Sequence, residues 1–189
     1  MSLRDRIALV TGASRGIGAS TAEVLARRGS RVVLSGRTIA DLDCVAAKIR
    51  EKGGQALVVP CDVLDAHQVE GMIGRVVKEW GRLDILVNNA GMGTPSLPVE
   101  EILPEAWDET MALNLRSAFF CVRVAAPVMK RQEYGRIVNV SSFAGRNYSR
   151  MSGPQYVQPR PAFRDSPGRW RWKSVPMEST LMRSRPASC

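Results

Sequence analysis

Short runs of aliphatic and β-branched residues alternate with longer amphipathic segments along the first 140 residues. The short runs lack an apolar/polar alternation, which is typical of strands buried on both faces of a parallel sheet. These expected strands cover residues 7–10, 31–35, 56–60, 83–87 and 136–140. The segments between them have apolar residues at helical spacing, and the expected helices cover residues 17–28, 39–52, 66–80 and 104–132. Strand–helix alternation of this kind predicts an α/β fold, a doubly wound parallel sheet with right-handed crossovers.

The helix boundaries are marked by glycine. The first expected helix has apolar residues at Ile17, Val24 and Leu25 and ends at Gly29, and the third ends at Gly81. Glycine after the last periodic residue is a signal for a helix C-terminus. His67, in the first turn of the third expected helix, is interpreted as a surface residue.

The pattern stops after residue 149. Six prolines punctuate the rest of the chain, and no stretch there keeps a period. Residues 157–189 carry seven Arg or Lys and two acidic residues, a net charge of +5, whereas residues 1–156 carry only +4. We therefore divide the chain into a domain over 1–156 and a disordered tail over 157–189, with the sheet truncated after the fifth strand. A mildly basic body with a basic tail gives no reason to expect a nucleic-acid partner.

The cysteines and the N-terminal sequence indicate the cellular compartment. Cys44, Cys61, Cys121 and Cys189 show no spacing typical of a metal site, so we expect no metal. Scattered cysteines suit a reducing compartment. The N-terminus shows no signal-peptide pattern and the sequence shows no spanning segment, so we expect a cytoplasmic protein without a membrane partner.

A glycine-rich turn lies between the first expected strand and the first expected helix, at residues 11–18 (TGASRGIG). Glycines in this position let the backbone turn tightly and approach a pyrophosphate, which binds the free N–H groups of the helix N-terminus. The turn therefore predicts a dinucleotide site. The alternative is an ordinary βα turn.

The end of the second expected strand indicates which dinucleotide fits. An acidic residue there would bind the ribose 2′-OH of NAD, whereas arginine accommodates the 2′-phosphate of NADP. This chain has Arg37 there and a second cation, Arg15, in the glycine-rich turn. The sequence thus favours NADP(H) over NAD(H), unless Arg37 merely begins the solvent face of the next helix.

Polar residues close the next two expected strands. Asp62 follows the third strand and residues 88–91 (NNAG) close the fourth, on the edge where open α/β sheets bind ligands. Asp62 could equally be the N-cap of the following helix.

Taken together, TGASRGIG, CDV (61–63), NNAG, LNL (113–115), NVSS (139–142) and the following Tyr156 resemble the short-chain dehydrogenase/reductase family, in its 3-oxoacyl-carrier-protein reductase-like members. The likeness covers residues 1 to about 156. It implies a Rossmann-type fold and NAD(P)(H)-dependent hydride transfer between a secondary alcohol and a ketone or other carbonyl. It also implies a small-molecule substrate and homo-oligomers.

The resemblance assigns roles to residues. Tyr156 corresponds to the general acid, Ser142 (rather than Ser141) to the hydroxyl that holds the substrate oxygen, and Asn114 to a residue that organises a proton-relay water through a distorted helix turn. Thr11 would tie the glycine-rich turn to the fourth strand. The cofactor-binding residues implied are Gly12, Ser14, Arg15, Gly16, Ile17, Gly18, Arg37, Asp62, Val63, Asn89, Ala90 and Gly91.

The tail departs from the family pattern at the fourth residue after Tyr156. The family has a lysine there, which stabilises the tyrosinate, and this chain has Arg160 between Pro159 and Pro161. Those prolines disfavour the helical turn that would bring Arg160 beside Tyr156.

Back-translation of the tail suggests why it departs from the family pattern. Plausible codons for residues 159–180, read one base earlier, give AKAGVPGLTRTLAMEVGPYGIN, which restores a lysine four residues after Tyr156. We therefore interpret the tail as a frameshift product. The sequence predicts an NADP(H)-dependent oxidoreductase that is impaired in this chain. The alternatives are an inactive nucleotide-binding remnant and a non-functional frameshifted product.

Overall fold

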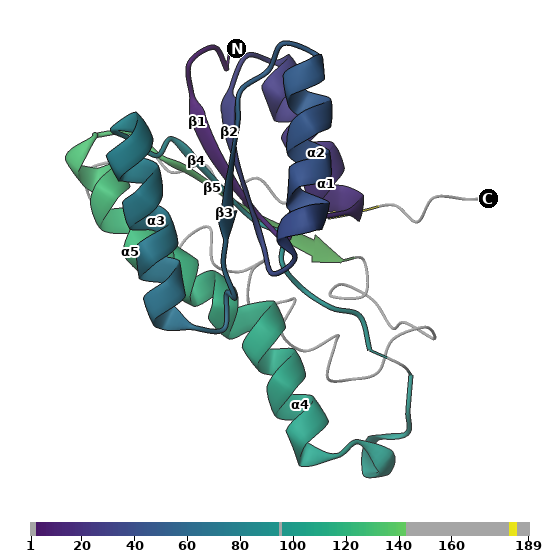
Figure 1. Cartoon of the computed structure of the whole chain (residues 1–189). Helices are drawn as coiled ribbons and strands as arrows, with labels where there is room; N and C mark the ends of the chain where they lie inside the picture. Colours follow the sequence, from purple (N-terminus) through teal and green to yellow (C-terminus); the bar gives the residue numbers. More distant parts are fainter. Residues whose placement is uncertain (1–2, 95, 143–181, 185–189) are drawn as a thin grey trace.

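The computed structural model describes residues 3–94, 96–142 and 182–184, and its strands and helices follow the predicted alternation (Figure 1). The first five strands are β1 (Ile7–Thr11), β2 (Arg31–Gly36), β3 (Ala56–Pro60), β4 (Ile85–Asn88) and β5 (Arg136–Ser142). The α-helices are α1 (Gly16–Arg27), α2 (Ile39–Glu51), α3 (Ala66–Trp80), α4 (Pro104–Met111) and α5 (Ser117–Arg131). A 3-10 turn, η1 (Val99–Glu101), precedes α4, and a π-helical segment, η2 (Ala112–Arg116), joins α4 to α5.

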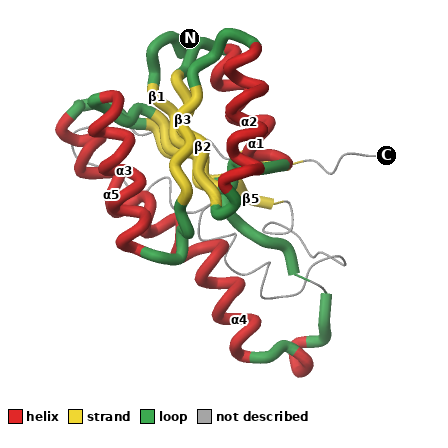
Figure 2. The backbone as a smooth tube through the Cα atoms, in the orientation of Figure 1, coloured by secondary structure: helices red, strands yellow, loops and turns green. Residues whose placement is uncertain are grey.

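The sheet, drawn in yellow in Figure 2, is parallel, and these strands pair in the order β3-β2-β1-β4-β5. The chain runs outward from β1 to β3 and then returns to the other side of β1 for β4. The winding therefore reverses between β1 and β4. In open α/β sheets, ligands bind beyond the carboxyl ends of the strands at such a switch point. The predicted Rossmann-type, doubly wound sheet is confirmed, and a ligand is expected to bind where β1 and β4 end.

Helices cover both faces of the sheet, with α1 and α2 on one face and α3 and α5 on the other (Figure 1). Along β1, Ile7 and Leu9 pack with the core of α3 and α5, whereas Ala8 and Val10 pack with that of α1 and α2. All four side chains are fully buried. Because both faces are covered, the strand sequence is continuously apolar.

Small residues bring α1 close to the sheet. Gly18 and Ala22 are buried, while Ile17 and Val24 are 47% and 43% exposed. The helix predicted from the spacing of Ile17 and Val24 is present, but these two side chains are partly exposed and do not form its packed face. The reason is close packing, since a Cβ atom on Gly18 would overlap the carbonyl oxygen of Gly12.

The predicted helix over 104–132 is present as α4, η2 and α5, which follow one another without a break. At the junction of η2 with α5, the Ser117 hydroxyl donates to the Leu113 carbonyl oxygen at 2.6 Å. Among the described residues, this stretch (Pro104–Arg131) is the one that is long and apolar enough to cross a membrane. Cys121 and Met129 are buried in the core shared with α3, so α5 serves as a core helix.

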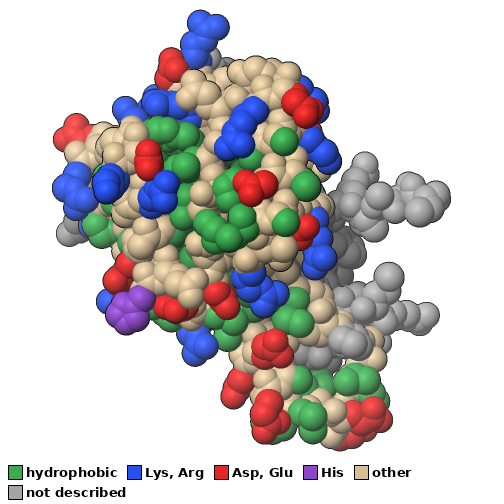
Figure 3. All heavy atoms as spheres, viewed as in Figure 1, with side chains coloured by type: hydrophobic (Ala, Val, Ile, Leu, Met, Phe, Trp, Pro, Cys, Tyr) green, Lys and Arg blue, Asp and Glu red, His purple; other side chains and the backbone are tan. Residues whose placement is uncertain are grey.

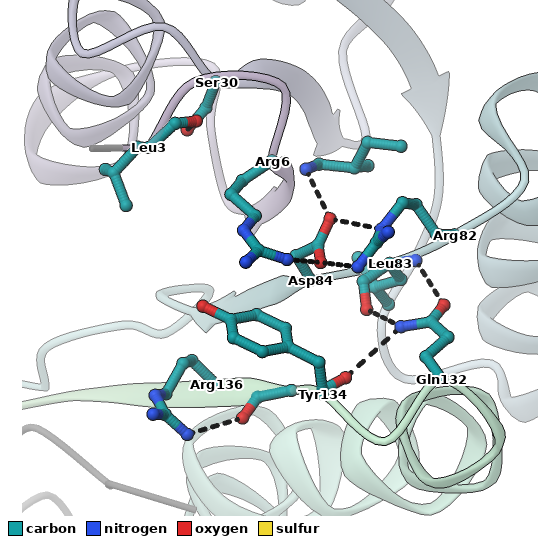
Figure 4. A network of polar contacts seen from close by, with 11 residues as sticks. Leu3, Arg6, Ser30, Arg82, Leu83, Asp84, Gln132, Tyr134 and Arg136 are labelled. Atoms are coloured by element: carbon teal, nitrogen blue, oxygen red, sulfur yellow. Dashed lines mark hydrogen bonds and ion pairs between the residues drawn. The ribbon is translucent and has the colours of Figure 1, made fainter. Parts of the chain in front are cut away.

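The buried carboxylate of Asp84 holds the amino-terminal edge of the sheet together (Figure 4). It accepts hydrogen bonds from Arg6 Nη1 at 2.9 Å, from Arg82 Nε at 2.9 Å and from the Ile7 backbone N–H at 3.0 Å. Next to it, the Gln132 side chain accepts from the Leu83 N–H at 2.9 Å and donates to the Leu83 carbonyl oxygen at 2.8 Å. Because Leu83 pairs with a side chain, β4 begins two residues later than predicted.

A short strand, β6 (Met182–Ser184), lies parallel to β5 at the edge of the sheet, with Met182 opposite Val140. The five predicted strands thus account for the sheet through residue 142, and β6 adds an edge that the hydrophobic pattern did not indicate. The boundary expected at residue 156, and the rest of the tail, lie outside the described residues.

Candidate cofactor and active site

The glycine-rich turn packs tightly on one side and is open on the other. Gly12 and Gly16 have positive φ angles of 62° and 57°, a conformation that favours glycine. A Cβ atom on Gly12 would lie 2.9 Å from the Ala90 Cα, whereas one on Gly16 would meet nothing within 4 Å. The turn is therefore pressed against the end of β4 at Gly12 and leaves space beside Gly16.

The first turn of α1 offers uncapped donors to that space. Its N-cap residue, Arg15, makes no side-chain hydrogen bond to the helix, and the first turn contains no acidic residue. The N–H groups there, with the positive end of the helix dipole, suit a phosphate. Ser14 and Ile17 flank this position, and Ile17 is exposed. These residues fit the pyrophosphate of a dinucleotide.

Two side chains lock the turn to the end of β4. The Thr11 hydroxyl donates to the Val87 carbonyl oxygen at 3.4 Å and accepts from the N–H groups of Asn89 and Ala90, each at 3.1 Å. The Asn89 side-chain amide donates to the carbonyl oxygens of Thr11 at 2.9 Å and Gly12 at 3.0 Å. The expected tie from Thr11 to the fourth strand is confirmed. The reciprocal role of the Asn89 side chain was missed, because periodicity carries no signal for it.

The residues expected on the adenosine side follow the first three strands. Arg15 in the glycine-rich turn after β1 and Arg37 after β2 are both exposed, and Val63 after β3 is buried. Asp62 Oδ1 accepts from the Leu64 N–H at 3.0 Å, so this carboxylate shapes the turn after β3.

Asp65, and not Asp62, is the N-cap of α3. It accepts from the N–H groups of His67 at 2.9 Å and Gln68 at 3.2 Å. The hydrogen bond from the Gln68 backbone, and then that from its side chain, lowers the pKa of Asp65. The alternative reading of Asp62 as the cap is therefore wrong. His67 is exposed, as expected.

The end of β5 carries the two serines. Ser141 is buried and Ser142, the last residue of the strand, is half-buried. Two residues before Ser141, the Asn139 side chain accepts through Oδ1 from Asn88 Nδ2 at 2.9 Å, and this bond ties β5 to β4. Ser142 is therefore the more accessible hydroxyl at the crevice. Tyr156, the candidate acid, and Arg160 lie outside the described residues.

Asn114 lies in the π-helical segment and is buried. Its amide oxygen accepts from the Met92 N–H and its amide nitrogen donates to the Met92 carbonyl oxygen, both at 3.1 Å. The chain just beyond Gly91 is thus fixed against η2. The distorted helix turn implied for Asn114 is present as η2.

Two buried thiols, Cys61 and Cys121, lie in the core that the sheet shares with α3 and α5. Burial raises the pKa of Cys61 to about 11 and the pKa of Cys121 to about 12. Both cysteines are therefore neutral near pH 7, and neither is a nucleophile there. Over residues 3–94, 96–142 and 182–184, no group of three or more His, Cys, Asp or Glu could hold a metal ion.

A protein-family model described as short chain dehydrogenase matches residues 6–157. The chain belongs to the short-chain dehydrogenase family. The match includes the glycine-rich turn, the end of β4 and β5, and it ends one residue after Tyr156.

Curated short-chain dehydrogenases are similar over the same region. The chain is 39% identical over 145 residues to a 3-oxoacyl-[acyl-carrier-protein] reductase of Synechocystis sp., covering 76% of this chain and 58% of that protein. It is 41% identical over 141 residues to a cis-4-hydroxycyclohexanecarboxylate dehydrogenase of Sinomonas cyclohexanicum, covering 75% and 56%. The chain thus spans a little over half the length of these curated relatives.

Solved structures show the same fold. A metagenomic short-chain oxidoreductase in complex with NADP superimposes with a TM-score of 0.88 and 34% sequence identity, covering all of this chain and 85% of that one.

Proposed function

We propose that this short-chain dehydrogenase binds NADP(H) across the glycine-rich turn and serves hydride transfer between a secondary alcohol and a ketone or other carbonyl. The observation that carries the proposal is the packing of the turn. Gly12 and Gly18 are closed against Ala90 and the turn itself, while Gly16 is open above the uncapped start of α1. An ordinary βα turn has no need for this combination.

The preference for NADP(H) rests on two arginines. Arg15 and Arg37 are exposed on the two loops that flank the adenosine side, and β2 ends in Ser35-Gly36 without a carboxylate. Guanidinium groups bind phosphate oxygens through charge-assisted hydrogen bonds. The similar structure in complex with NADP supports this choice.

In the proposed reaction, Ser142 and Tyr156 act on the substrate oxygen, and Asn114 supports the site through the backbone. The nicotinamide, when bound, supplies or accepts the hydride. The Ser142 hydroxyl would donate a hydrogen bond to the substrate oxygen, and Tyr156 would deliver the proton to that oxygen. Asn114 positions the wall of the site, because its amide fixes the backbone of Met92.

Proton transfer by Tyr156 is expected to be weak in this chain. A tyrosine has an ordinary pKa of about 10 and needs a nearby cation to act as a proton shuttle at neutral pH. The family lysine is replaced by Arg160 between two prolines.

The end of the family match at residue 157 supports a frameshift beyond Tyr156. This favours a second candidate function, nucleotide binding without turnover. NADPH binding without ketone reduction would support it, and turnover comparable to a full-length relative would exclude it.

A fluorescence titration with NADPH tests the binding site. Gly18→Ala adds a Cβ atom that overlaps the Gly12 carbonyl oxygen, so binding should weaken at least tenfold. Gly74→Ala is the matched control, because Gly74 is also helical and its added Cβ meets nothing within 4 Å. Equal NADPH affinity in the two variants would contradict the proposed site.

A further inference from the structure

Charge is separated along the strand direction of the sheet. The segments that lead into the five strands (residues 3–6, 24–31, 48–56, 77–84 and 128–136) carry thirteen Arg or Lys and five acidic residues, a net charge of +8. The rest of residues 3–142 carries five basic and eleven acidic residues, a net charge of −6. Helix dipoles favour cations at helix C-termini, but arginines also lie at the starts of strands, as Arg31 and Arg136 do. We call these five segments the basic edge.

The basic edge contains a groove between the C-terminal ends of α1 and α2. Its volume is about 300 Å³, and its floor is formed by Ala26, Ile49 and the neighbouring glycines. Arg27 and Lys52 stand on its rim, where Lys52 pairs with Glu23 at 3.3 Å. This ion pair is half-exposed and easily exchanged for another carboxylate. The groove thus offers an apolar floor with cations around it.

The opposite end of the molecule carries an acidic and apolar projection. Residues 97–109 include Glu100, Glu101 and three further acidic residues, and no Arg or Lys occurs from 93 to 115. Val99 is 69% exposed and Leu103 is 66% exposed beside these carboxylates. In Figure 1 the η1–α4 region lies at the end of the molecule remote from the turns that precede the strands, and Figure 3 shows acidic and apolar side chains together there.

We propose that a second copy of this chain docks its 97–109 projection into the groove between α1 and α2. The two surfaces are complementary in charge, and each combines apolar contact area with a charged border. They lie at opposite ends of one molecule, so a single copy cannot join them to each other. Contact between different surfaces is head-to-tail and extends into a chain of copies unless the rotation closes a ring.

The attraction is electrostatic and should depend on salt. At an ionic strength of 0.01 M the Debye length is about 30 Å, whereas at 1 M it is about 3 Å. Sedimentation velocity of the full chain, from 5 to 200 µM, should show the average mass rising with concentration in 10 mM NaCl. In 500 mM NaCl the association should be at least tenfold weaker.

Charge reversal identifies the two surfaces. Arg27→Glu/Lys52→Glu reverses the charge of the rim, and Glu100→Lys/Glu101→Lys/Glu105→Lys changes the net charge of the projection from −5 to +1. Each of the two variants alone should stay monomeric in 10 mM NaCl, because its groove and its projection then carry net charges of the same sign. Mixed in equal amounts, the two variants should associate again, since each retains the partner that the other needs. Circular dichroism checks that both are folded.

Arg116→Glu/Arg123→Glu is the matched control. Both arginines are exposed on η2 and α5, and the pair changes the net charge as much as the groove variant does. This control should associate like the unmodified chain. Three results would overturn the proposal: a monomer at 200 µM in low salt, loss of association in the control, or association that persists in the groove variant. The last result would mean that the projection binds other cations of the second copy, such as those of residues 157–189.

Discussion

The Thr11 hydroxyl and the Asn89 amide hold each other across the ends of β1 and β4. Thr11 Oγ1 accepts from the Asn89 backbone N–H at 3.1 Å, and Asn89 Nδ2 donates to the Thr11 carbonyl oxygen at 2.9 Å. These bonds fix the start of the glycine-rich turn against the switch point of the sheet. The position of the first turn of α1 therefore depends on two side chains that would not themselves need to touch a phosphate.

Replacing the Thr11 hydroxyl should loosen the turn. Thr11→Val leaves the partly buried N–H groups of Asn89 and Ala90 without their acceptor, which costs about 1–3 kcal/mol of unfolding free energy. NADPH affinity should fall as well. Thr11→Ser keeps the hydroxyl and serves as the control. Urea unfolding and NADPH titration of both variants measure the two effects, and a Thr11→Val chain as stable as Thr11→Ser would contradict the role of this hydroxyl.

Removing the charge of Asp84 should destabilise the fold. Asp84→Asn takes away the buried carboxylate that Arg6 and Arg82 share, and because these two arginines are 33% and 40% exposed and stay partly hydrated, the loss should be about 1–3 kcal/mol of unfolding free energy. Glu79→Gln is the comparison, because the Arg75–Glu79 pair is exposed and worth less than about 0.5 kcal/mol. Both values come from urea unfolding. A loss below about 1 kcal/mol for Asp84→Asn would show that the network contributes little.

Relieving the backbone at Glu133 should stabilise the chain. Glu133 has a φ of 54° in the turn between α5 and β5, a left-handed conformation that costs a non-glycine residue about 1–2 kcal/mol. Glycine removes this cost but adds unfolded-state entropy, so Glu133→Gly should gain about 0.5–1 kcal/mol. Glu133→Ala removes the same charge but keeps the Cβ atom, and it should gain almost nothing. Thermal unfolding separates the two, and equal melting temperatures would argue against strain at this residue.

The buried thiols should not react with thiol reagents in the folded chain. In a Cys44→Ser/Cys189→Ser variant, the remaining Cys61 and Cys121 have raised pKa values of about 11 and 12, so few thiolates form at pH 8. A thiol reagent should label neither until urea is added, and then both. Because these pKa values exceed the ordinary 9.0, the thiols of the unfolded chain ionise first. Stability should therefore be full below pH 9 and fall as the pH rises toward 11–12. Rapid native labelling at pH 8 would contradict this.

Much of the fold could be predicted from the hydrophobic pattern, because strands buried on both faces leave continuous apolar runs. The pattern failed where other forces decide the structure. Ile17 and Val24 have helical spacing but are exposed, since α1 approaches the sheet through glycine and alanine. The strand predicted from Leu83 starts at Ile85, because Gln132, distant in sequence, captures the backbone of Leu83.

Parts of the candidate site could be predicted from the sequence, and other parts could not. The glycine-rich turn could be predicted, because its glycines are dictated by close backbone approach, whereas the tie through Thr11 was implied by the family resemblance. Competing local hydrogen bonds decided the cap of α3, and spacing alone could not choose between Asp62 and Asp65. The reciprocal bonds of the Asn89 side chain depend on the pairing of β1 with β4, which the local sequence does not encode.

The central claim is that this chain binds NADP(H) in preference to NAD(H) through Arg15 and Arg37. The most direct test measures the Kd values of NADPH and NADH by fluorescence on one preparation, with Arg15→Ala/Arg37→Ala beside it. Charge-assisted hydrogen bonds to the 2′-phosphate, worth about 1.5–3 kcal/mol, predict NADPH binding about 10- to 100-fold tighter. This preference should shrink to less than about threefold in the double variant. Equal affinities in the unmodified chain, or tighter binding of NADH, would contradict the account.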